Sequence, residues 1–187
     1  GLFVAATRYK LDDFKPYLYK TTDYGKTWTK IVNGIDAKHF TRVIRADKKR
    51  PGLLYAGTES GMYASFDDGA NWHAFQMNLP IVPITDLAVK DDNLVVATQG
   101  RSFWILDGLA LLRQLDEKVL KSDVTMLTPR PTYKRRGGRG RASLQNGQNP
   151  DGGVVVPFFI KEVPDDKVTV SLSFHAVAAG GKPGVAI

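Results

Sequence analysis

Two segments of the chain share one pattern, and this pattern constrains the fold more than any other feature. Residues 21–28 are TTDYGKTW and residues 65–72 are SFDDGANW. In each segment a hydroxyl residue and an Asp can accept hydrogen bonds from the amides of a tight turn, and a Gly supplies the positive φ that other residues resist. The closing Trp is large enough to fill the gap between neighbouring strands or units. We therefore interpret the following as structural turn residues: Thr21, Asp23, Gly25, Trp28, Ser65, Asp67, Gly69 and Trp72.

The spacing of these turns predicts a repeat of short strands. Asp23 and Asp67 lie 44 residues apart, and the segment LYAGT at 54–58 aligns with LVVAT at 94–98. A period of about 40–45 residues with four strands per unit is typical of β-propeller blades. Because the repeat places the two Trp residues alike, we expect Trp28 and Trp72 to occupy equivalent buried positions.

Three units of three, four and three strands are expected within residues 1–106. The first unit is expected to have strands at 2–7 and 17–20, separated by an insertion at 8–16, and a third strand after the turn at 21–28. The strands of the second unit are expected at 40–46, 53–58, 62–65 and 72–75, and those of the third at 84–89, 93–98 and 102–106. Fewer than three complete blades would leave open strand edges, which natural proteins avoid. We therefore expect the rest of a propeller ring, or other copies of the chain, to cover those edges.

The chain changes character after residue 106. Asp107 is a candidate helix N-cap, followed by a leucine-rich stretch that predicts a short helix near 107–120 in place of a fourth strand. Residues 124–153 are rich in Arg, Gly and Pro and predict a linker, without helix or paired strand over 134–148. Residues 154–187 predict the start of a small β-sandwich, with strands at 154–156, 158–160 and 167–174. The expected fold is all-β, with residues 1–123 as the last blades of a propeller.

The net charge of +7 comes mostly from one tract. Six of the positive charges lie between residues 130 and 141, with no acidic residue among them, and they are Arg130, Lys134, Arg135, Arg136, Arg139 and Arg141. Arg-Gly tracts that bind RNA repeat many times with interleaved aromatic residues, whereas Tyr133 alone is nearby here. We therefore expect a solvated linker and no nucleic-acid partner.

Several other functions are disfavoured by the sequence. No run of about 18 apolar residues is present, so no membrane span is expected. The chain contains no Cys, and His39, His73 and His175 are scattered without metal-ligand spacing. We expect neither a metal nor a cofactor.

Three residues are candidates for a ligand-binding face. Glu59 and Arg101 follow the second strand of adjacent units at comparable points, and Arg8 follows the corresponding strand of the first unit. These side chains can face one ligand surface, or Glu59 and Arg101 can be exposed loop residues that bond to each other.

Residue types needed for glycoside hydrolysis are also present, without a recognisable arrangement. A sialidase-like site needs an arginine cluster, a Tyr/Glu nucleophile pair and an acid, for which the chain offers Arg8, Arg42, Arg45, Arg101, Tyr9, Tyr63 and Glu59. A xyloglucanase-like site needs two spaced carboxylates, for which it offers Asp12, Asp13 and Asp86. Whether the protein is an enzyme stays open at this point.

Three longer stretches resemble one protein family. They are LDDFKPY at 11–17 running into the first turn, RPGLLYAGT at 50–58, and residues 86–90 through QGRSFWILD at 99–107. The chain is similar in these stretches to bacterial sortilin-like (VPS10-like) proteins with BNR repeats, whose repeated turn is called an Asp-box and which are often labelled glycosyl hydrolases. The resemblance implies an Asp-box β-propeller followed by a β-sandwich in an exported protein. It favours a module that binds or scaffolds a protein, peptide or glycan. The alternative is a sialidase- or xyloglucanase-like hydrolase whose catalytic residues lie mostly elsewhere, since fold does not imply function.

Overall fold

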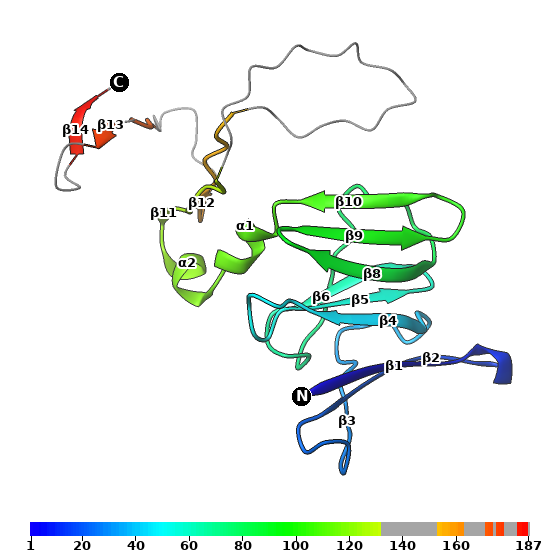
Figure 1. The fold of residues 1–187 in the computed structure, drawn as a ribbon. Helices are drawn as coiled ribbons and strands as arrows, with labels where there is room; N and C mark the ends of the chain where they lie inside the picture. The colour runs from blue at the N-terminus through cyan, green and yellow to red at the C-terminus, as the bar shows by residue number, and fades with distance from the viewer. Residues whose placement is uncertain (132–152, 163–170, 174, 178–182, 187) are drawn as a thin grey trace.

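The fold is mostly β-strand, in several antiparallel sheets. A computed structural model describes residues 1–131, 153–162, 171–173, 175–177 and 183–186 (Figure 1). The first sheet has the order β1-β2-β3, the second β4-β5-β6-β7 and the third β10-β9-β8. Their bounds are β1 Leu2–Arg8, β2 Asp13–Thr21, β3 Thr29–Lys30, β4 Thr41–Ala46, β5 Leu54–Thr58, β6 Gly61–Ser65, β7 His73–Ala74, β8 Ile84–Lys90, β9 Asn93–Thr98 and β10 Phe103–Asp107. The predicted strand counts of three, four and three are confirmed.

The three sheets lie one against the next, with the second in the middle (Figure 1). Strand β4 is in contact with both β1 and β8. Because side chains alternate across a strand, Val43 and Ile44 of β4 enter different apolar clusters on opposite faces of the sheet. Every residue of β5 and β6 is buried. The middle sheet thus forms the centre of the stack.

A glycine sets the spacing between the second and third sheets. A Cβ on Gly57 would lie 2.6 Å from Ile84 and 2.7 Å from Val43. These distances are shorter than any real Cβ contact, so only glycine lets β5 approach β8 this closely. The result is a core between the two sheets that includes Tyr55, Leu87 and other residues, most of them below a few per cent exposed.

The predicted insertion at 8–16 forms a continuous hairpin. Strand β1 extends to Arg8, a 3-10 helix follows at Tyr9–Leu11, and β2 already begins at Asp13. Arg8 pairs with Asp13 across the hairpin, so the strands reach further than the repeat alignment predicts. The hairpin carries exposed side chains beyond the edge of the stack, and these matter for the site described below.

Two short helices replace the single helix predicted near 107–120. Helix α1 spans Leu109–Gln114 and α2 spans Glu117–Lys121. The prediction that Asp107 is the N-cap is wrong: Asp107 ends β10, and the capping residue of α1 is Gly108 at φ 82°. Asp116 caps α2 instead, because its carboxylate accepts a hydrogen bond from the Val119 amide at 2.9 Å.

Two small antiparallel pairs follow the helices. Strand β11 (Val124–Met126) pairs with β12 (Phe158–Ile160), and β13 (His175–Val177) pairs with β14 (Pro183–Ala186). The predicted linker therefore does not begin at 124, because three residues there form a paired strand. The strand expected at 158–160 is confirmed, whereas 154–156 has no regular structure.

Two expectations for the C-terminal part lie outside the described residues. They are the linker conformation at 134–148 and most of the strand at 167–174. Within the ranges that the structure describes, neither helix approaches the length and apolar character that a membrane crossing requires.

Candidate functional site

The first repeated turn, at residues 21–28, is held by its own side chains. Thr21 Oγ1 donates to Asp23 Oδ1 at 2.7 Å and accepts from the Gly25 amide at 2.9 Å. The Asp23 carboxylate also accepts from the amide and the hydroxyl of Thr27, at 2.9 and 2.6 Å. The hydrogen bonds from Thr27 and Thr21 lower the pKa of Asp23 to about 2. Its carboxylate is thus fully engaged in the turn.

The second turn, at residues 65–72, repeats these bonds. Ser65 Oγ donates to Asp67 Oδ1 at 2.8 Å and accepts from the Gly69 amide at 2.9 Å. Asp67 accepts from the amide and side chain of Asn71, at 2.9 and 2.8 Å. Burial opposes ionisation of Asp67, but the bonds from Asn71 and Ser65 outweigh it and hold the pKa below its usual value. The same local chemistry shapes both turns.

The prediction that both turn tryptophans are buried is wrong for Trp28. Trp72 is 3% exposed, whereas Trp28 is 42% exposed. Trp72 donates its indole N–H to the carbonyl of Ile31, at 2.9 Å, and is covered by the chain that leaves the first sheet. Trp28 donates only to the Gly25 carbonyl of its own turn, at 3.1 Å. The difference arises because no described segment covers the outer face of the first sheet.

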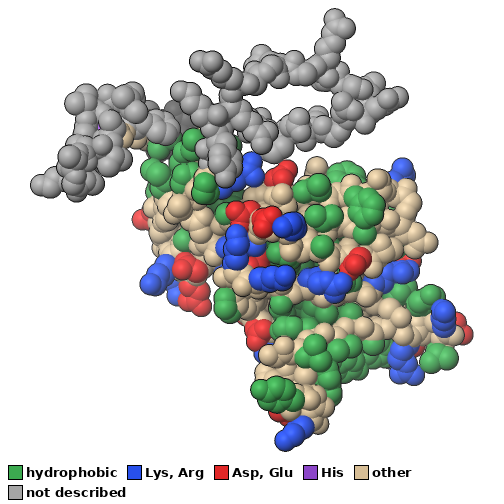
Figure 2. Space-filling view, in the orientation of Figure 1, with side chains coloured by type: hydrophobic (Ala, Val, Ile, Leu, Met, Phe, Trp, Pro, Cys, Tyr) green, Lys and Arg blue, Asp and Glu red, His purple; other side chains and the backbone are tan. Residues whose placement is uncertain are grey.

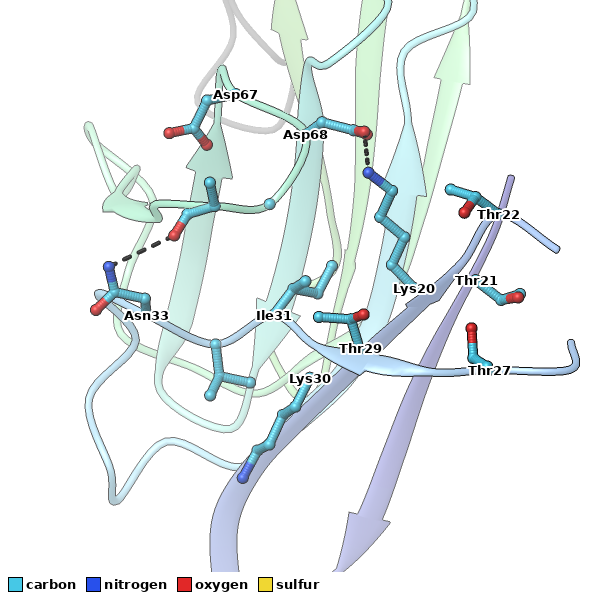
Figure 3. Close-up of a pocket in the computed structure, with 13 residues that line it drawn as sticks. Lys20, Thr21, Thr22, Thr27, Thr29, Lys30, Ile31, Asn33, Asp67 and Asp68 are labelled. Carbon is cyan, nitrogen blue, oxygen red and sulfur yellow. Dashed lines mark hydrogen bonds and ion pairs between the residues drawn. The ribbon is translucent and has the colours of Figure 1, made fainter.

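A groove of about 400 Å³ runs between the two turns (Figure 3). Lys20 and Asp68 form an ion pair across it, and the Asn33 side chain donates to the Ala70 carbonyl at 3.4 Å. Lys30 also lines the groove, and its ammonium lies 4.4 Å from the centre of the Tyr17 ring. The Lys20–Asp68 ion pair thus spans the seam between the first and second sheets.

A cluster of aromatic side chains gathers where the first and second sheets meet at the other end of the strands. Tyr9 stacks on Phe40 with ring centroids 5.1 Å apart, and Phe14 lies 6.2 Å from Phe40. Tyr9 is 37% exposed and Phe14 is 51% exposed, so this aromatic surface faces solvent. The Arg42 guanidinium lies over the Phe40 ring, 5.3 Å from its centroid. We call these four residues, together with Arg8, Asp13 and Glu59, the strand-end cluster.

Charged groups of the strand-end cluster pair with one another. Both Nε and an Nη of Arg42 contact Glu59 Oε2 at 2.6 Å, and Arg8 lies 3.5 Å from Asp13. The Tyr17 hydroxyl donates to Asp13 at 2.6 Å. This hydrogen bond from Tyr17 lowers the pKa of Asp13, so its carboxylate is held in the ionised form.

One buried hydroxyl fixes the position of the cluster. Thr41 is fully buried, and its Oγ1 accepts from the Tyr17 amide at 2.9 Å and bonds to the carbonyls of Tyr17 and Ala6. The Glu59 amide donates to the Phe40 carbonyl at 3.0 Å. The β1–β2 hairpin is thereby tied to the start of β4 and to the turn after β5.

The structure brings together two of the three predicted ligand-face residues. Arg8 and Glu59 both belong to the strand-end cluster, but the carboxylate of Glu59 bonds to Arg42, not to Arg101. Arg101 lies in the exposed β9–β10 turn, and its carbonyl accepts from the Trp104 indole at 3.0 Å. The alternative in which Glu59 and Arg101 bond to each other is therefore wrong.

Five of the residues considered for hydrolysis lie in the strand-end cluster, namely Arg8, Tyr9, Asp13, Arg42 and Glu59, and the others lie outside it. Arg45 pairs with Asp86 at 2.6 Å, and the Tyr63 hydroxyl contacts His39 Nδ1 at 2.8 Å in a buried position. Asp12 ends the 3-10 helix at φ 54°. Among the described residues, no three His, Asp or Glu side chains are grouped so that they could hold a metal ion.

Sequence reasoning missed the aromatic part of the cluster. Phe40 stands just before a predicted strand and Phe14 within the insertion, and nothing in the repeat shows that they meet. The signal was the density of Tyr, Leu and Phe side chains in a loop where polar residues are the norm. Comparison with known proteins finds no matching family model and no similar curated protein.

Proposed function

We propose that residues 1–107 are blades of an Asp-box β-propeller that serves as a binding or scaffolding module and not as a catalyst. Three features support this proposal. The strand counts are three, four and three, the two repeated turns have the same hydrogen bonds, and β4 lies beside both β1 and β8. In a propeller, the remaining blades of the ring or other copies of the chain would cover the open outer faces.

The strand-end cluster carries the functional part of the proposal. Tyr9 and Phe14 offer exposed rings on a rigid base, and Arg42 is fixed beside them by Glu59. Aromatic rings and arginines dominate the binding energy of many interfaces, because they bury large area with few rotatable bonds. Such a surface fits the side chains of a peptide or the apolar faces of a sugar ring.

Catalysis by this cluster is less well supported. A glycosidase needs a carboxylic acid whose pKa is raised, so that it can protonate the leaving group. Asp13 has the opposite environment, because the Tyr17 hydroxyl and Arg8 favour its ionised form. The resemblance to exported propeller proteins supports a position outside the cytoplasm, which we propose as the working localisation.

Binding of the whole chain to glycan and peptide arrays tests this function. We expect selective binding that Phe14→Ala weakens by about tenfold, as for a residue at an interface centre. Tyr24→Ala is the matched control, because Tyr24 is fully exposed within the first turn, away from the cluster. Equal loss in both variants, or release of reducing sugar from the array glycans, would contradict the proposal.

A further inference from the structure

The first and second sheets present the same three side-chain positions on corresponding faces. Tyr19 pairs with Val4 on β1 and with Lys30 on β3. Tyr63 pairs with Ala56 on β5 and with Ala74 on β7 in the same register. The Trp at the end of each repeated turn completes the face, which is Trp28 on the first sheet and Trp72 on the second. The set Val4, Tyr19 and Trp28 therefore corresponds to the set Ala56, Tyr63 and Trp72.

On the second sheet this face is covered by a segment from the first unit, residues 31–35, which turns at Asn33 and Gly34, where the Ile35 amide donates to the Val32 carbonyl at 3.1 Å. Ile31 and Ile35 are both 8% exposed and belong to the apolar cluster that contains Tyr63 and Trp72. The Ile31 carbonyl accepts from the Trp72 indole, and the Asn33 carbonyl accepts from the Trp72 amide at 2.8 Å. The segment thus combines two aliphatic side chains with backbone acceptors.

The middle of the segment is fitted closely to the turn. Asn33 donates its side-chain amide to Asn71 Oδ1 at 2.7 Å. Gly34 has φ 94°, and a Cβ there would lie 2.2 Å from the Trp72 carbonyl oxygen. The position after the Asn therefore admits only glycine.

On the first sheet the corresponding face is open. Val4 is 38% exposed, Trp28 is 42% exposed, and with Tyr19 they line a cavity of about 280 Å³. Hydrophobic side chains gather over the lower part of the molecule in Figure 2, where β1, β2 and β3 lie. The indole N–H of Trp28 donates to the Gly25 carbonyl of its own turn, whereas the indole N–H of Trp72 donates to Ile31 of the covering segment.

We propose that the face formed by Val4, Tyr19 and Trp28 is a docking site for a peptide segment of the type Ile-x-Asn-Gly-Ile that turns at its Asn-Gly pair. The occupant is inferred by continuity with the interface between residues 31–35 and Trp72, since a Tyr and a Trp recur in the same register and Val4 stands where the second sheet has Ala56. Two aliphatic residues fill the cavity beside Trp28, and the glycine clears the turn backbone. The carbonyl of the first aliphatic residue replaces the Gly25 carbonyl as acceptor of the Trp28 indole N–H. This inference rests on the proposed equivalence of the repeat units and names the chemistry that a neighbouring unit must present.

Indole N–H signals of the whole chain labelled with ¹⁵N-Trp can report occupancy of this site. The probe is a capped peptide with the sequence of residues 30–36, KIVNGID. We expect the Trp28 signal, assigned with Trp28→Phe, to shift saturably while that of Trp72 stays in place. A matched peptide with Ala in place of the glycine should bind at least about tenfold more weakly, because the Cβ of the Ala overlaps the carbonyl of the turn.

Three results would overturn the inference. The first is a Trp28 signal that does not shift at the highest soluble concentration of the peptide. The second is an equal shift of the Trp28 signal with the alanine peptide. The third is a Trp28 signal that shifts with protein concentration when no peptide is present. The last result would identify a second copy as the occupant. The array experiment tests the strand-end cluster through Phe14, whereas the peptide titration tests the face that contains Trp28. Failure of the array experiment is therefore distinguishable from failure of the peptide titration.

Discussion

Removal of the Arg113 side chain should cost the fold more stability than any other single ion-pair deletion in the described chain. Arg113 projects from α1, is 9% exposed, and pairs with Asp47, whose side chain is fully buried. Its Nε lies 3.0 Å from both carboxylate oxygens of Asp47, and its other nitrogens bond to Asp92 and to the carbonyl of Asp91. One guanidinium therefore ties the helix to turns of the second and third sheets.

The size of the effect follows from this burial. Deleting one partner of a buried ion pair costs about 3–5 kcal/mol, because the other charge stays buried without its counter-charge. For Arg113→Ala we expect a loss in that range, which moves the urea midpoint by more than about 1 M at an m-value of about 1–3 kcal/mol per molar. Lys121→Ala is the control: its pair with Glu117 is 75% and 86% exposed and should contribute no more than about 0.5 kcal/mol.

Equilibrium urea unfolding followed by circular dichroism decides the matter. A midpoint for Arg113→Ala equal to that of Lys121→Ala would refute the reasoning. The double variant Asp47→Asn with Arg113→Met should recover much of the loss, because no uncompensated charge is left and the Asn oxygen still accepts from the amides of Lys49 and Arg50.

The Asp47–Arg113 pair also predicts how the stability of the fold depends on pH. Burial raises the pKa of Asp47, but the bonds from Arg113 and from the amides of Lys49 and Arg50 outweigh it and leave the pKa below its usual value. The contribution of the Asp47–Arg113 pair to the free energy of unfolding should be complete above the ordinary carboxyl pKa. It should disappear as the pH falls through the lowered pKa of Asp47 in the folded protein.

Three further outcomes are expected. Gly34→Ala should lower the free energy of unfolding by about 1–3 kcal/mol, because the new Cβ overlaps the carbonyl of Trp72. Gly100→Ala is the control, because a Cβ there has nothing within 4 Å and should show only the smaller cost of the positive φ. Thermal unfolding of both variants measures the difference. Thr41→Val should cost about 1–3 kcal/mol, because it leaves the buried amide of Tyr17 without its acceptor, and an unchanged melting temperature would contradict this. Asp23 should titrate near pH 2 by carboxyl ¹³C NMR, so the turn keeps its bonds above the ordinary carboxyl pKa and loses them as pH falls through about 2.

Much of the strand pattern could be predicted from local sequence. The segments 93–98 and 84–89 combine β-branched residues with flanking turn residues, and the strands there begin and end within one residue of the prediction. The spacing of the two turns also predicts which strands correspond. These signals are local, so a single sequence contains them.

The errors arose where tertiary contacts decide. Asp107 has the residue type of an N-cap, but pairing with Asn93 keeps it in β10 and moves the start of the helix to Leu109. Trp28 closes the same turn pattern as Trp72, yet its burial depends on a neighbouring segment that the turn itself does not specify. Val124–Met126 became a strand because Phe158–Ile160, more than thirty residues later, pairs with it.

The strand-end cluster was predictable only in part, for the same reason. Arg8 and Glu59 were found from their position after equivalent strands, whereas the stacking of Tyr9 on Phe40 depends on how the hairpin folds over β4. The sequence shows that aromatic residues are present but not that they meet.

Acrylamide quenching of single-tryptophan variants tests the central claim, that the two turns are equivalent units of which one is covered and the other is open. The variants keep Trp28 or Trp72 and replace the other tryptophans, including Trp104, by Phe. With exposures of 42% and 3%, Trp28 should be quenched several times more strongly than Trp72 and should emit at longer wavelength. Equal quenching of the two, or stronger quenching of Trp72, would contradict the account.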